Sequence, residues 1–413
     1  MRQHRPLMCK SARRLLNADV GFCIDFRLIV HIGCVFNVFP YYCRHRHRVC
    51  VPVRNVRRRL FTKELTLRSG RIFAFVACFL LAGCERAVPP AYELGAKVKA
   101  LTSDDIKDPD ALRRKIEEQL VKQCGTPLEP KLIGAPQKSA DHLAHGAEVY
   151  RLRCAACHGS TGYGNGPAAK VLYPLPRDYS KGIFKFVSVV DGSKPLRDDL
   201  MRTVRNGARG TSMPAFGLLP QEDLDAVVDY VLVLTHRGEL EDALREAAVD
   251  EEEEINDKLA ENLAAGIAKK WEVPRDKIIH PLTVEPPYTW ASIEKGREAF
   301  AGANGVCFKC HDKDGSARNL LEVGKDPWGH EGRAADLTSG MFHGGATSID
   351  IYRRIYGGVK PMPAFATGYP KDPDMLWHLV HYVQYISGAR RREVVKQQGM
   401  VHRPEPAKPA AGG

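Results

Sequence analysis

The sequence predicts an all-α fold made of two small helical domains joined by a helical linker. The main observation is an internal repeat, because a segment that begins near residue 146 returns near residue 296 with the same landmarks in the same order. Each copy closes with an amphipathic stretch that predicts a helix, Leu224 to Leu234 in the first and Leu376 to Ile386 in the second. Between the copies, residues 238–273 are rich in Glu, Ala, Leu and Lys, which favour a helix.

Four landmarks define the repeat. The first copy contains, in order, Gly146-Ala147-Glu148-Val149-Tyr150, Cys154-Ala155-Ala156-Cys157-His158, Asp178-Tyr179-Ser180-Lys181-Gly182-Ile183-Phe184 and Met213-Pro214-Ala215-Phe216. The second copy contains Gly296-Arg297-Glu298-Ala299-Phe300, Cys307-Phe308-Lys309-Cys310-His311, Asp336-Leu337-Thr338-Ser339-Gly340-Met341-Phe342 and Met362-Pro363-Ala364-Phe365. Duplication of one domain explains this order most economically. We therefore assign a domain to residues 141–237, the first copy, and another to residues 290–388, the second copy.

The segments around the two copies are assigned by composition. Residues 84–140 are polar and contain proline and one helical stretch, so they are expected to form a tether with a packing helix in which Cys124 is a partly buried thiol without a role. Residues 238–289 predict an acidic, solvated linker helix followed by an extended connector. Residues 389–413 are basic and then rich in Pro and Ala, and we expect them to be disordered.

The net charge of +12 is concentrated at the N-terminus. Residues 1–83 contain 16 Lys and Arg but only 3 Asp and Glu, which leaves 45 basic and 46 acidic side chains in residues 84–413. A protein that binds nucleic acid presents a basic surface on its folded part. The near-neutral remainder therefore excludes nucleic acid as an expected partner.

Residues 66–83 predict a lipoprotein-type signal peptide. Ile72 to Ala82 form an apolar run of eleven residues preceded by two arginines, too short to span a bilayer core of about 30 Å. The run ends in Leu81-Ala82-Gly83-Cys84, which resembles a bacterial lipobox and implies a lipid attached to Cys84. The alternatives are a buried apolar helix and an uncleaved anchor. We thus expect an exported protein that is lipid-anchored at the periplasmic side of a bacterial membrane.

Residues 1–65 do not fit such a signal. They contain five cysteines, many arginines and no clear apolar period, whereas an export signal normally begins near its own basic region. Our hypothesis is that this stretch is a start-site artefact and that translation begins near Leu65 or Leu67. The alternative is a genuine disordered basic extension.

The two Cys-x-x-Cys-His runs are the attachment signature of c-type haem. Cysteines three residues apart lie on one face of a helical turn and add to the haem vinyl groups, and the next residue, His158 or His311, then lies under the iron as its proximal ligand. A zinc site would need a second pair of ligands near each motif, and thioredoxin-type chemistry would not explain a histidine after both pairs. We therefore predict two covalently bound haem c groups, attached at Cys154, Cys157, Cys307 and Cys310.

Both copies resemble the small mono-haem cytochrome c domain. The resemblance covers residues 140–237 and 290–388, about half of the chain. It implies three main helices around the haem, an N-terminal helix that ends at the motif, a final helix that crosses the first, and a methionine supplied by a C-terminal loop. The glycine and aromatic residue before each motif, with Tyr230 and Tyr382 in the closing helices, fit that crossing.

Met213 and Met362 are the candidates for the sixth iron ligand. Each begins a Met-Pro-Ala-Phe segment after a glycine-containing loop, 56 residues after Cys157 and 52 after Cys310. Proline stiffens such a loop, and a thioether favours ferrous iron and raises its potential. A lone methionine is usually core filler, but repetition in the same tetrapeptide favours ligation. The alternatives are histidines: His142 or His236 for the first iron and His343, His378 or His381 for the second.

The resemblance also implies residues that pack on the haem. Gly166-Pro167 resembles a family pair whose proline carbonyl accepts the N–H of the proximal histidine, and the second copy has no such proline. Arg177 and Trp328 are candidates for contacts with haem propionates, or are ordinary packing residues.

These features predict an electron carrier and not an enzyme. Two six-coordinate irons leave no position open for a substrate, so the expected function is a di-haem relay between a respiratory donor complex and a terminal acceptor. The expected partners are redox proteins of a membrane respiratory chain. The alternatives are a cytochrome subunit fixed in a larger respiratory oxidoreductase and a di-haem peroxidase, which needs one iron that opens to peroxide.

Overall fold

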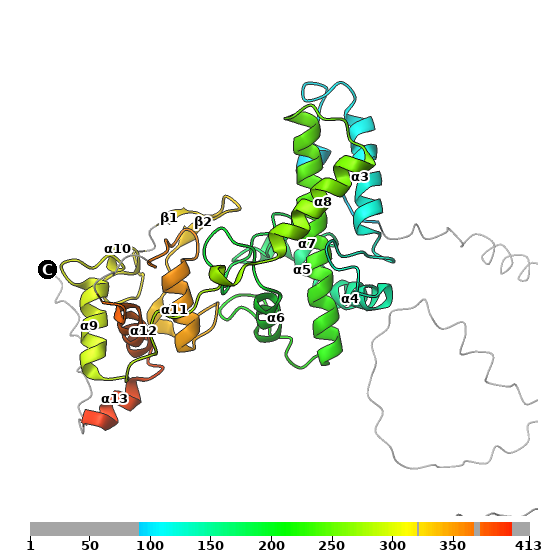
Figure 1. Ribbon diagram of the computed structural model, residues 1–413. Coiled ribbons are helices and arrows are strands. Elements are labelled where there is room, and N and C mark those ends of the chain that lie inside the picture. Colours follow the sequence, from blue (N-terminus) through cyan, green and yellow to red (C-terminus); the bar gives the residue numbers. More distant parts are fainter. Residues whose placement is uncertain (1–90, 320–321, 367–371, 399–413) are drawn as a thin grey trace, which may run out of the picture. The chain divides into compact units, whose positions relative to one another are not determined.

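The computed structural model describes residues 91–319, 322–366 and 372–398 (Figure 1). Its longer helices are α3 (Pro109–Cys124), α4 (Ala140–Arg153), α6 (Arg197–Asn206), α7 (Gln221–Val249), α8 (Asp257–Trp271), α9 (Trp290–Ala301), α11 (Ser348–Gly357), α12 (Met375–Ile386) and α13 (Arg391–Gln398). Its short helices are α2 (Ala96–Lys99), α5 (Ala155–His158), α10 (Phe308–His311), η2 (Ala169–Val171), η3 (Arg275–Lys277) and η4 (Leu337–Ser339). Its strands, β1 (Glu322–Lys325) and β2 (Glu331–Arg333), form an antiparallel hairpin. The predicted all-α fold, of the cytochrome c-like helical type, is confirmed.

Several expectations concern residues that lie outside the described part of the chain. These are the extension at residues 1–65, the signal peptide at residues 66–83 and the lipidation of Cys84. Within the described ranges, no helix is both long enough and apolar enough to cross a membrane.

The helices of the two copies begin at polar caps that the sequence supplies. Ser139 caps α4, since its hydroxyl accepts the amide of His142 at 3.2 Å. Thr289 caps α9 in the same way at 3.3 Å. These side chains satisfy amides that have no partner inside the helix, and they set where the first helix of each copy starts.

In the first copy, α4 packs against α7 at a close approach that only glycine permits. A Cβ built on Gly146 would lie 2.1 Å from the carbonyl oxygen of Ala226 on α7. One turn later, the rings of Tyr150 and Tyr230 pack with their centroids 5.4 Å apart at an angle of 58°. Both tyrosines are buried, so this helix pair forms the core of the first copy.

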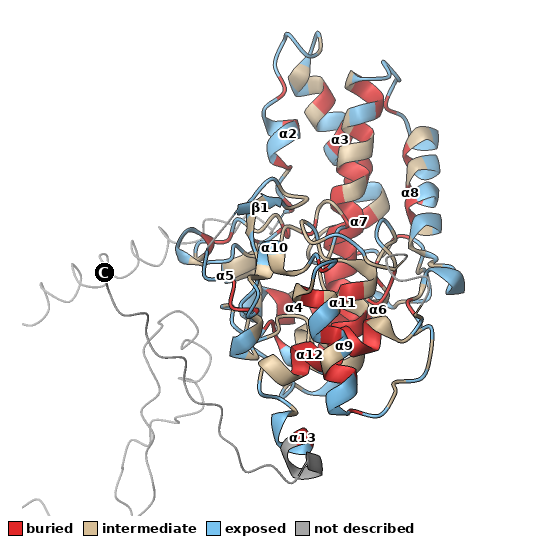
Figure 2. Cartoon of the chain, turned by 90° about the vertical axis from the view of Figure 1, so that its left-hand side faces the viewer, coloured by how far each residue is buried: buried red, intermediate tan, exposed pale blue. Residues whose placement is uncertain are grey.

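The second copy repeats this helix pair with α9 and α12. A Cβ on Gly296 would lie 1.9 Å from the carbonyl oxygen of His378, and the rings of Phe300 and Tyr382 pack at 5.2 Å and 56°. Figure 2 shows the buried faces of these helices. The packing of the first helix on the last, which the glycine and aromatic positions predict, is therefore present in both copies.

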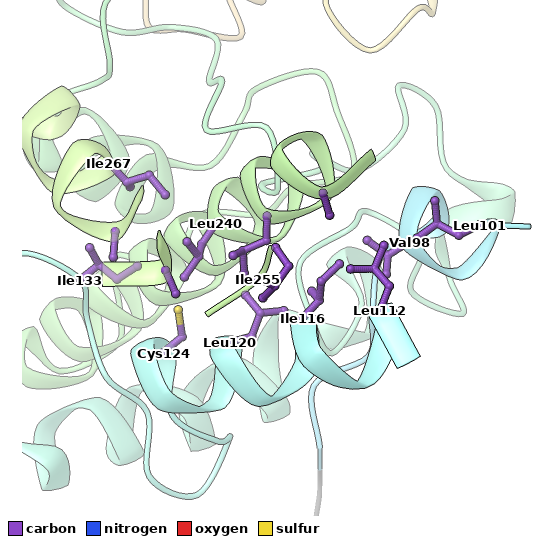
Figure 3. Packing of buried hydrophobic residues seen from close by; sticks show 14 residues of the cluster. Val98, Leu101, Leu112, Ile116, Leu120, Cys124, Ile133, Leu240, Ile255 and Ile267 are labelled. Carbon is purple, nitrogen blue, oxygen red and sulfur yellow. The ribbon is translucent and has the colours of Figure 1, made fainter. Parts of the chain in front are cut away.

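A third core lies outside the two copies, between α3, α8 and the C-terminal half of α7 (Figures 1 and 3). Ile116 and Leu120 of α3 are buried with Leu240 and Leu244 of α7, and Cys124 points into the same cluster. The expectation of a solvated linker helix is therefore wrong. The closing helix of the first copy, α7, continues without a break to Val249, because the apolar residues of its C-terminal half pack against the apolar face of α3.

The C-terminal tail also departs from its prediction in part. Residues 391–398 of the tail expected to be disordered form α13, and Val394 is buried in the cluster of the second copy. Arg390 and Arg391 at its start also pack on the rings of Tyr288 and Tyr385, so this basic segment is held against the second copy. Residues 399–413 lie outside the described part.

Candidate functional site

The first Cys-x-x-Cys-His motif forms a single helical turn directly after α4. Cys154 ends α4 and caps α5, and its carbonyl accepts the amides of Cys157 at 3.1 Å and His158 at 2.9 Å. This turn places both sulfurs and the imidazole on one short rigid element. It is the arrangement that two thioether bonds and one axial ligand to the same haem require.

The second motif repeats the turn after α9. The carbonyl of Cys307 accepts the amides of Cys310 at 3.2 Å and His311 at 3.0 Å. The residue after each histidine adopts a left-handed conformation, with φ of 80° at Gly159 and 59° at Asp312. The two motifs therefore share one backbone path although their intervening residues differ.

Both motif histidines are oriented by a backbone carbonyl. Nδ1 of His158 lies 3.0 Å from the Arg177 carbonyl oxygen, and Nδ1 of His311 lies 2.9 Å from that of Ala335. A carbonyl only accepts, so Nδ1 carries the proton and Nε2 keeps its lone pair for a metal. The expected acceptor, the Pro167 carbonyl, is not the partner of His158. Because the new acceptor does not depend on proline, the second copy has it as well.

Arg177 and Ala335 hold equivalent positions, each directly before the aspartate of the third landmark. The Asp178 carboxylate accepts the Ser180 amide at 2.9 Å and its hydroxyl at 2.6 Å. Asp336 accepts the amide and hydroxyl of Thr338 at 2.8 and 2.5 Å. The turn that follows each acceptor carbonyl is thus fixed in the same way. This repeated aspartate segment is evident in the sequence, but we did not predict from it that the carbonyl before it accepts from the motif histidine. The repetition of the segment in both copies was the signal that could have indicated such a role.

Burial sets the protonation of the motif side chains. It lowers the pKa of the His158 and His311 imidazoles, which favours the neutral form that binds a metal. It raises the pKa of the Cys154 thiol to about 12 and that of Cys307 to about 11. A thioredoxin-type nucleophile needs the opposite shift, so thiol-exchange chemistry is disfavoured.

The ligand set that each motif offers is small. The described cysteines, which include all four of the motifs, form no disulfide with one another. Across the described ranges, no group of three or more His, Cys, Asp or Glu side chains could hold a metal ion. Each motif instead provides two thiols and one imidazole, which is the set that haem c uses.

The two candidate methionines lie in loops of the same shape. Gly207 and Gly358 have φ of 67° and 71°, and a Cβ on them would lie 2.7 Å from the amide nitrogen of Ala215 and 2.8 Å from that of Ala364. The chain thus folds tightly over a glycine in each copy. Met213 and Met362 are half-buried, and the structure supports their equivalence.

The alternative histidines of the first copy are engaged elsewhere. Nε2 of His142 lies 2.8 Å from the buried carboxylate of Asp229. Nδ1 of His236 lies 3.2 Å from the Ile133 carbonyl, and its ring packs on Trp271 with a centroid distance of 4.8 Å. Both imidazoles therefore have structural partners.

The alternative histidines of the second copy are also engaged. His378 and His381 share the hydroxyl of Ser292 at 2.7 and 2.6 Å, inside the helix pair. Nδ1 of His343 contacts the carbonyl of Arg209, a residue of the first copy. These contacts leave the loop methionines as the better candidates for the sixth ligand.

Arg177 and Trp328 are brought together by the structure. The guanidinium carbon of Arg177 lies 3.6 Å from the centroid of a ring of Trp328. The indole nitrogen of Trp328 donates to the Asp178 carbonyl at 3.2 Å. These two residues, considered separately in the sequence as propionate contacts, therefore form one contact between the copies.

One family model matches a part of the chain. A family model described as "Cytochrome C oxidase, cbb3-type, subunit III" matches residues 141–231, from the start of α4 into α7. No curated protein matches the chain. A chain of the reducing HAO-like protein complex of Kuenenia stuttgartiensis is 27% identical, with a TM-score of 0.45 over 59% of this chain and 95% of that chain. The family match shows a c-type cytochrome domain in the first copy, and such a domain carries covalently bound haem c.

Proposed function

We propose that the chain is a di-haem c-type cytochrome that relays electrons at the outer face of a bacterial membrane. The donor would be a respiratory complex and the acceptor a terminal electron acceptor. The observation that carries the proposal is the repetition of the family-matched first copy by residues 290–388. The second copy has the same motif turn, the same histidine–carbonyl hydrogen bond and the same glycine-folded methionine loop.

The residues present fit a haem in each copy. Cys154, Cys157, Cys307 and Cys310 would hold the two haems through thioether bonds. Nε2 of His158 and of His311 would bind the iron, and the carbonyl on each Nδ1 would fix the ring and raise its basicity. Met213 and Met362 would close the far side with sulfur. Each bound haem would supply a one-electron iron couple.

Apolar side chains near the first motif agree with this assignment. Val171 at the end of η2 is exposed by 85%, and Tyr173 and Leu218 on the following loops of the cytochrome domain are exposed by 72% and 102%. Large apolar groups on a loop beside a cofactor motif are suited to contact a flat apolar macrocycle. Their exposure is in keeping with apolar groups that a bound haem would cover.

The relay function follows from closed coordination. With sulfur on one side and imidazole on the other, neither iron offers a site to a substrate, and the protein tunes a potential instead. This argues against a di-haem peroxidase. We further propose that a lipid on Cys84 holds the mature protein at the periplasmic side of a membrane, where redox proteins of a respiratory chain would be its partners.

A second candidate function is a cytochrome subunit fixed in a larger respiratory oxidoreductase. The observation that favours it is the description of the matched family, which is that of an oxidase subunit. Co-purification from membranes separates the two candidates. A stable complex would support the subunit, and recovery of the cytochrome alone would support the free carrier.

The haem count tests the main proposal. Full-length protein is expected to carry two haems that resist acid acetone, measured as the pyridine haemochrome per chain. Replacing Cys154 and Cys157 by alanine, or Cys307 and Cys310 by alanine, should each remove one haem, because each pair holds its own.

Cys124→Ala is the matched control, since this cysteine is buried far from both motifs in sequence and has no expected haem. It should retain two haems. A single haem in the unaltered protein, or a haem lost to acid acetone, would refute the di-haem proposal.

A further inference from the structure

The hairpin of β1 and β2 is a point where the two copies differ. In the first copy Asp178 lies 20 positions after His158, and in the second Asp336 lies 25 positions after His311. The second copy uses this extra length for the hairpin, whereas the described residues of the first copy form no strand there. A feature found in one copy alone points to a role that the domain itself does not need.

The tip of the hairpin is rigid. The Asp326 carboxylate accepts the amides of Trp328 and His330, each at 3.0 Å, and the Asp326 amide donates to the His330 carbonyl at 2.9 Å. The Asp326 side chain is 9% exposed. A turn closed by three hydrogen bonds presents Trp328 in a fixed orientation.

Trp328 contacts the segment of the first copy that follows its haem motif. Its ring packs on the guanidinium of Arg177 at 3.6 Å, within the range of a cation–π interaction. Two further contacts hold the same tip: Lys181 donates to the Pro327 carbonyl at 3.2 Å, and Lys185 pairs with Asp326 at 3.2 Å. The tip and this segment are therefore joined at several points.

The contact lies directly beside the carbonyl that orients His158. The Arg177 carbonyl accepts Nδ1–H of His158, and the next carbonyl along the chain, that of Asp178, accepts the indole N–H of Trp328. Burial lowers the pKa of Arg177 to about 10, and the charge of the Asp326 carboxylate opposes that shift, so the guanidinium stays charged over the Trp328 ring. Ring, guanidinium and carbonyl thus hold two consecutive peptides in place.

The second haem site has no equivalent dependence. The Asp336 carbonyl, which corresponds to that of Asp178, accepts the hydroxyl of Ser339 at 2.8 Å, from its own turn. The acceptor for His311 belongs to Ala335, which has no side chain able to reach a partner. Both histidines have their acceptor carbonyl in their own copy, but only the segment next to the His158 acceptor is also contacted by the other copy.

We propose that Trp328 is a positioning residue for the haem of the first copy. It packs on the Arg177 side chain and holds the peptide that directly follows the Arg177 carbonyl, the acceptor for His158, so that docking of the second copy sets the reduction potential of the first haem. The inference rests on the proposed function only in requiring haem at both motifs. Its physical basis is that a firm hydrogen bond on Nδ1 makes the imidazole a stronger donor to iron and lowers the potential, and a loosened bond raises it.

The test is a spectroscopic potential titration of the full-length, haem-loaded protein. Trp328→Ala should raise the potential of the first haem and leave the second unchanged. Trp328→Phe keeps the ring over Arg177 but loses the indole N–H, so it should raise the potential of the first haem by less. The component of the titration that is lost when Cys154 and Cys157 are both replaced by alanine identifies the first haem.

Trp290→Ala is the matched control. This tryptophan also belongs to the second copy, is 38% exposed and packs edge-on against Tyr385, a residue of its own copy. It should leave both potentials unchanged. Two haems whose potentials are the same in Trp328→Ala and in the unaltered protein would overturn the inference, whereas fewer than two haems in the unaltered protein would refute the proposed function instead.

Discussion

At the scale of single residues, the two haem sites are defined by a few backbone atoms as much as by side chains. The carbonyls of Arg177 and Ala335 orient the two motif histidines, and neither depends on its own side chain to do so. A backbone carbonyl that accepts a hydrogen bond cannot be recognised from the residue type, since every residue has one. Only the aspartate that follows each acceptor marks the position.

The methionine assignment makes a prediction at this scale. Met213→Ala and Met362→Ala should each convert one haem from low-spin to high-spin and lower its potential, because the ferrous-stabilising sulfur is lost. Absorption spectra and a potential titration measure both effects. Met341→Ala is the control, since Met341 is 57% exposed and lies outside the two loops. An unchanged spectrum in either loop variant would show that another group binds that iron.

At the scale of elements, the duplicated helix pair is the feature that carries both sites. α4 and α9 each end at a haem motif, and each is held against the closing helix of its copy at a glycine. The aromatic pair one turn further on has nearly the same geometry in the two copies. The close approach therefore sets where each motif begins relative to the rest of its domain.

The glycine contact can be tested by a pair of substitutions. Gly146→Ala should lower the free energy of unfolding by about 1–3 kcal/mol, because its Cβ would collide with a backbone carbonyl of α7. Gly266→Ala lies on an exposed face of α8 with no atom within 4 Å of the new Cβ. It should raise the free energy of unfolding by about 0.5–1 kcal/mol through helix propensity.

Urea unfolding of the full-length variants, followed by circular dichroism, measures both values. Equal effects of the two substitutions would contradict the close packing of α4 on α7.

At the scale of the whole described chain, the first copy is contacted by two other parts of the protein. Its closing helix extends into the core shared by α3 and α8, and its haem-motif segment is held by the hairpin tip of the second copy. His236 lies where the closing helix meets the Ile133 carbonyl and the Trp271 ring. It links the first copy to the helical core beside it.

His236 predicts an acid-sensitive stability. Burial lowers its pKa to about 4, so the folded chain binds its proton less readily than the unfolded chain does. The neutral His236 therefore stabilises the folded chain fully at pH values above the pKa of the unfolded chain, near 6.5. This stabilisation is lost as the pH falls towards the pKa of the folded chain, near 4. The difference corresponds to about 3 kcal/mol.

Free energies of unfolding between pH 7 and pH 4 check this effect. His236→Gln should flatten the acid-side loss, and the exposed His280→Gln should leave the profile as it is. A profile that keeps its full slope in His236→Gln would assign the acid sensitivity to another group.

The sequence predicted the features that depend on neighbouring residues. The motif turns, the helix that begins at Pro109 and the glycine-folded methionine loops follow from local spacing and repetition. Spacing within one turn fixes which side chains share a face, so the candidate ligands could be named residue by residue.

The tertiary structure alone decided the features that join distant segments. The burial of α7 beyond residue 237 needed an apolar face on α3, more than a hundred residues away, and the acceptor for His158 was the Arg177 carbonyl and not the expected Pro167 carbonyl. The contact of Trp328 with Arg177 spans 151 positions. A local pattern shows that a face is apolar or that a donor needs a partner, but the partner is selected by which segments the folded chain brings together.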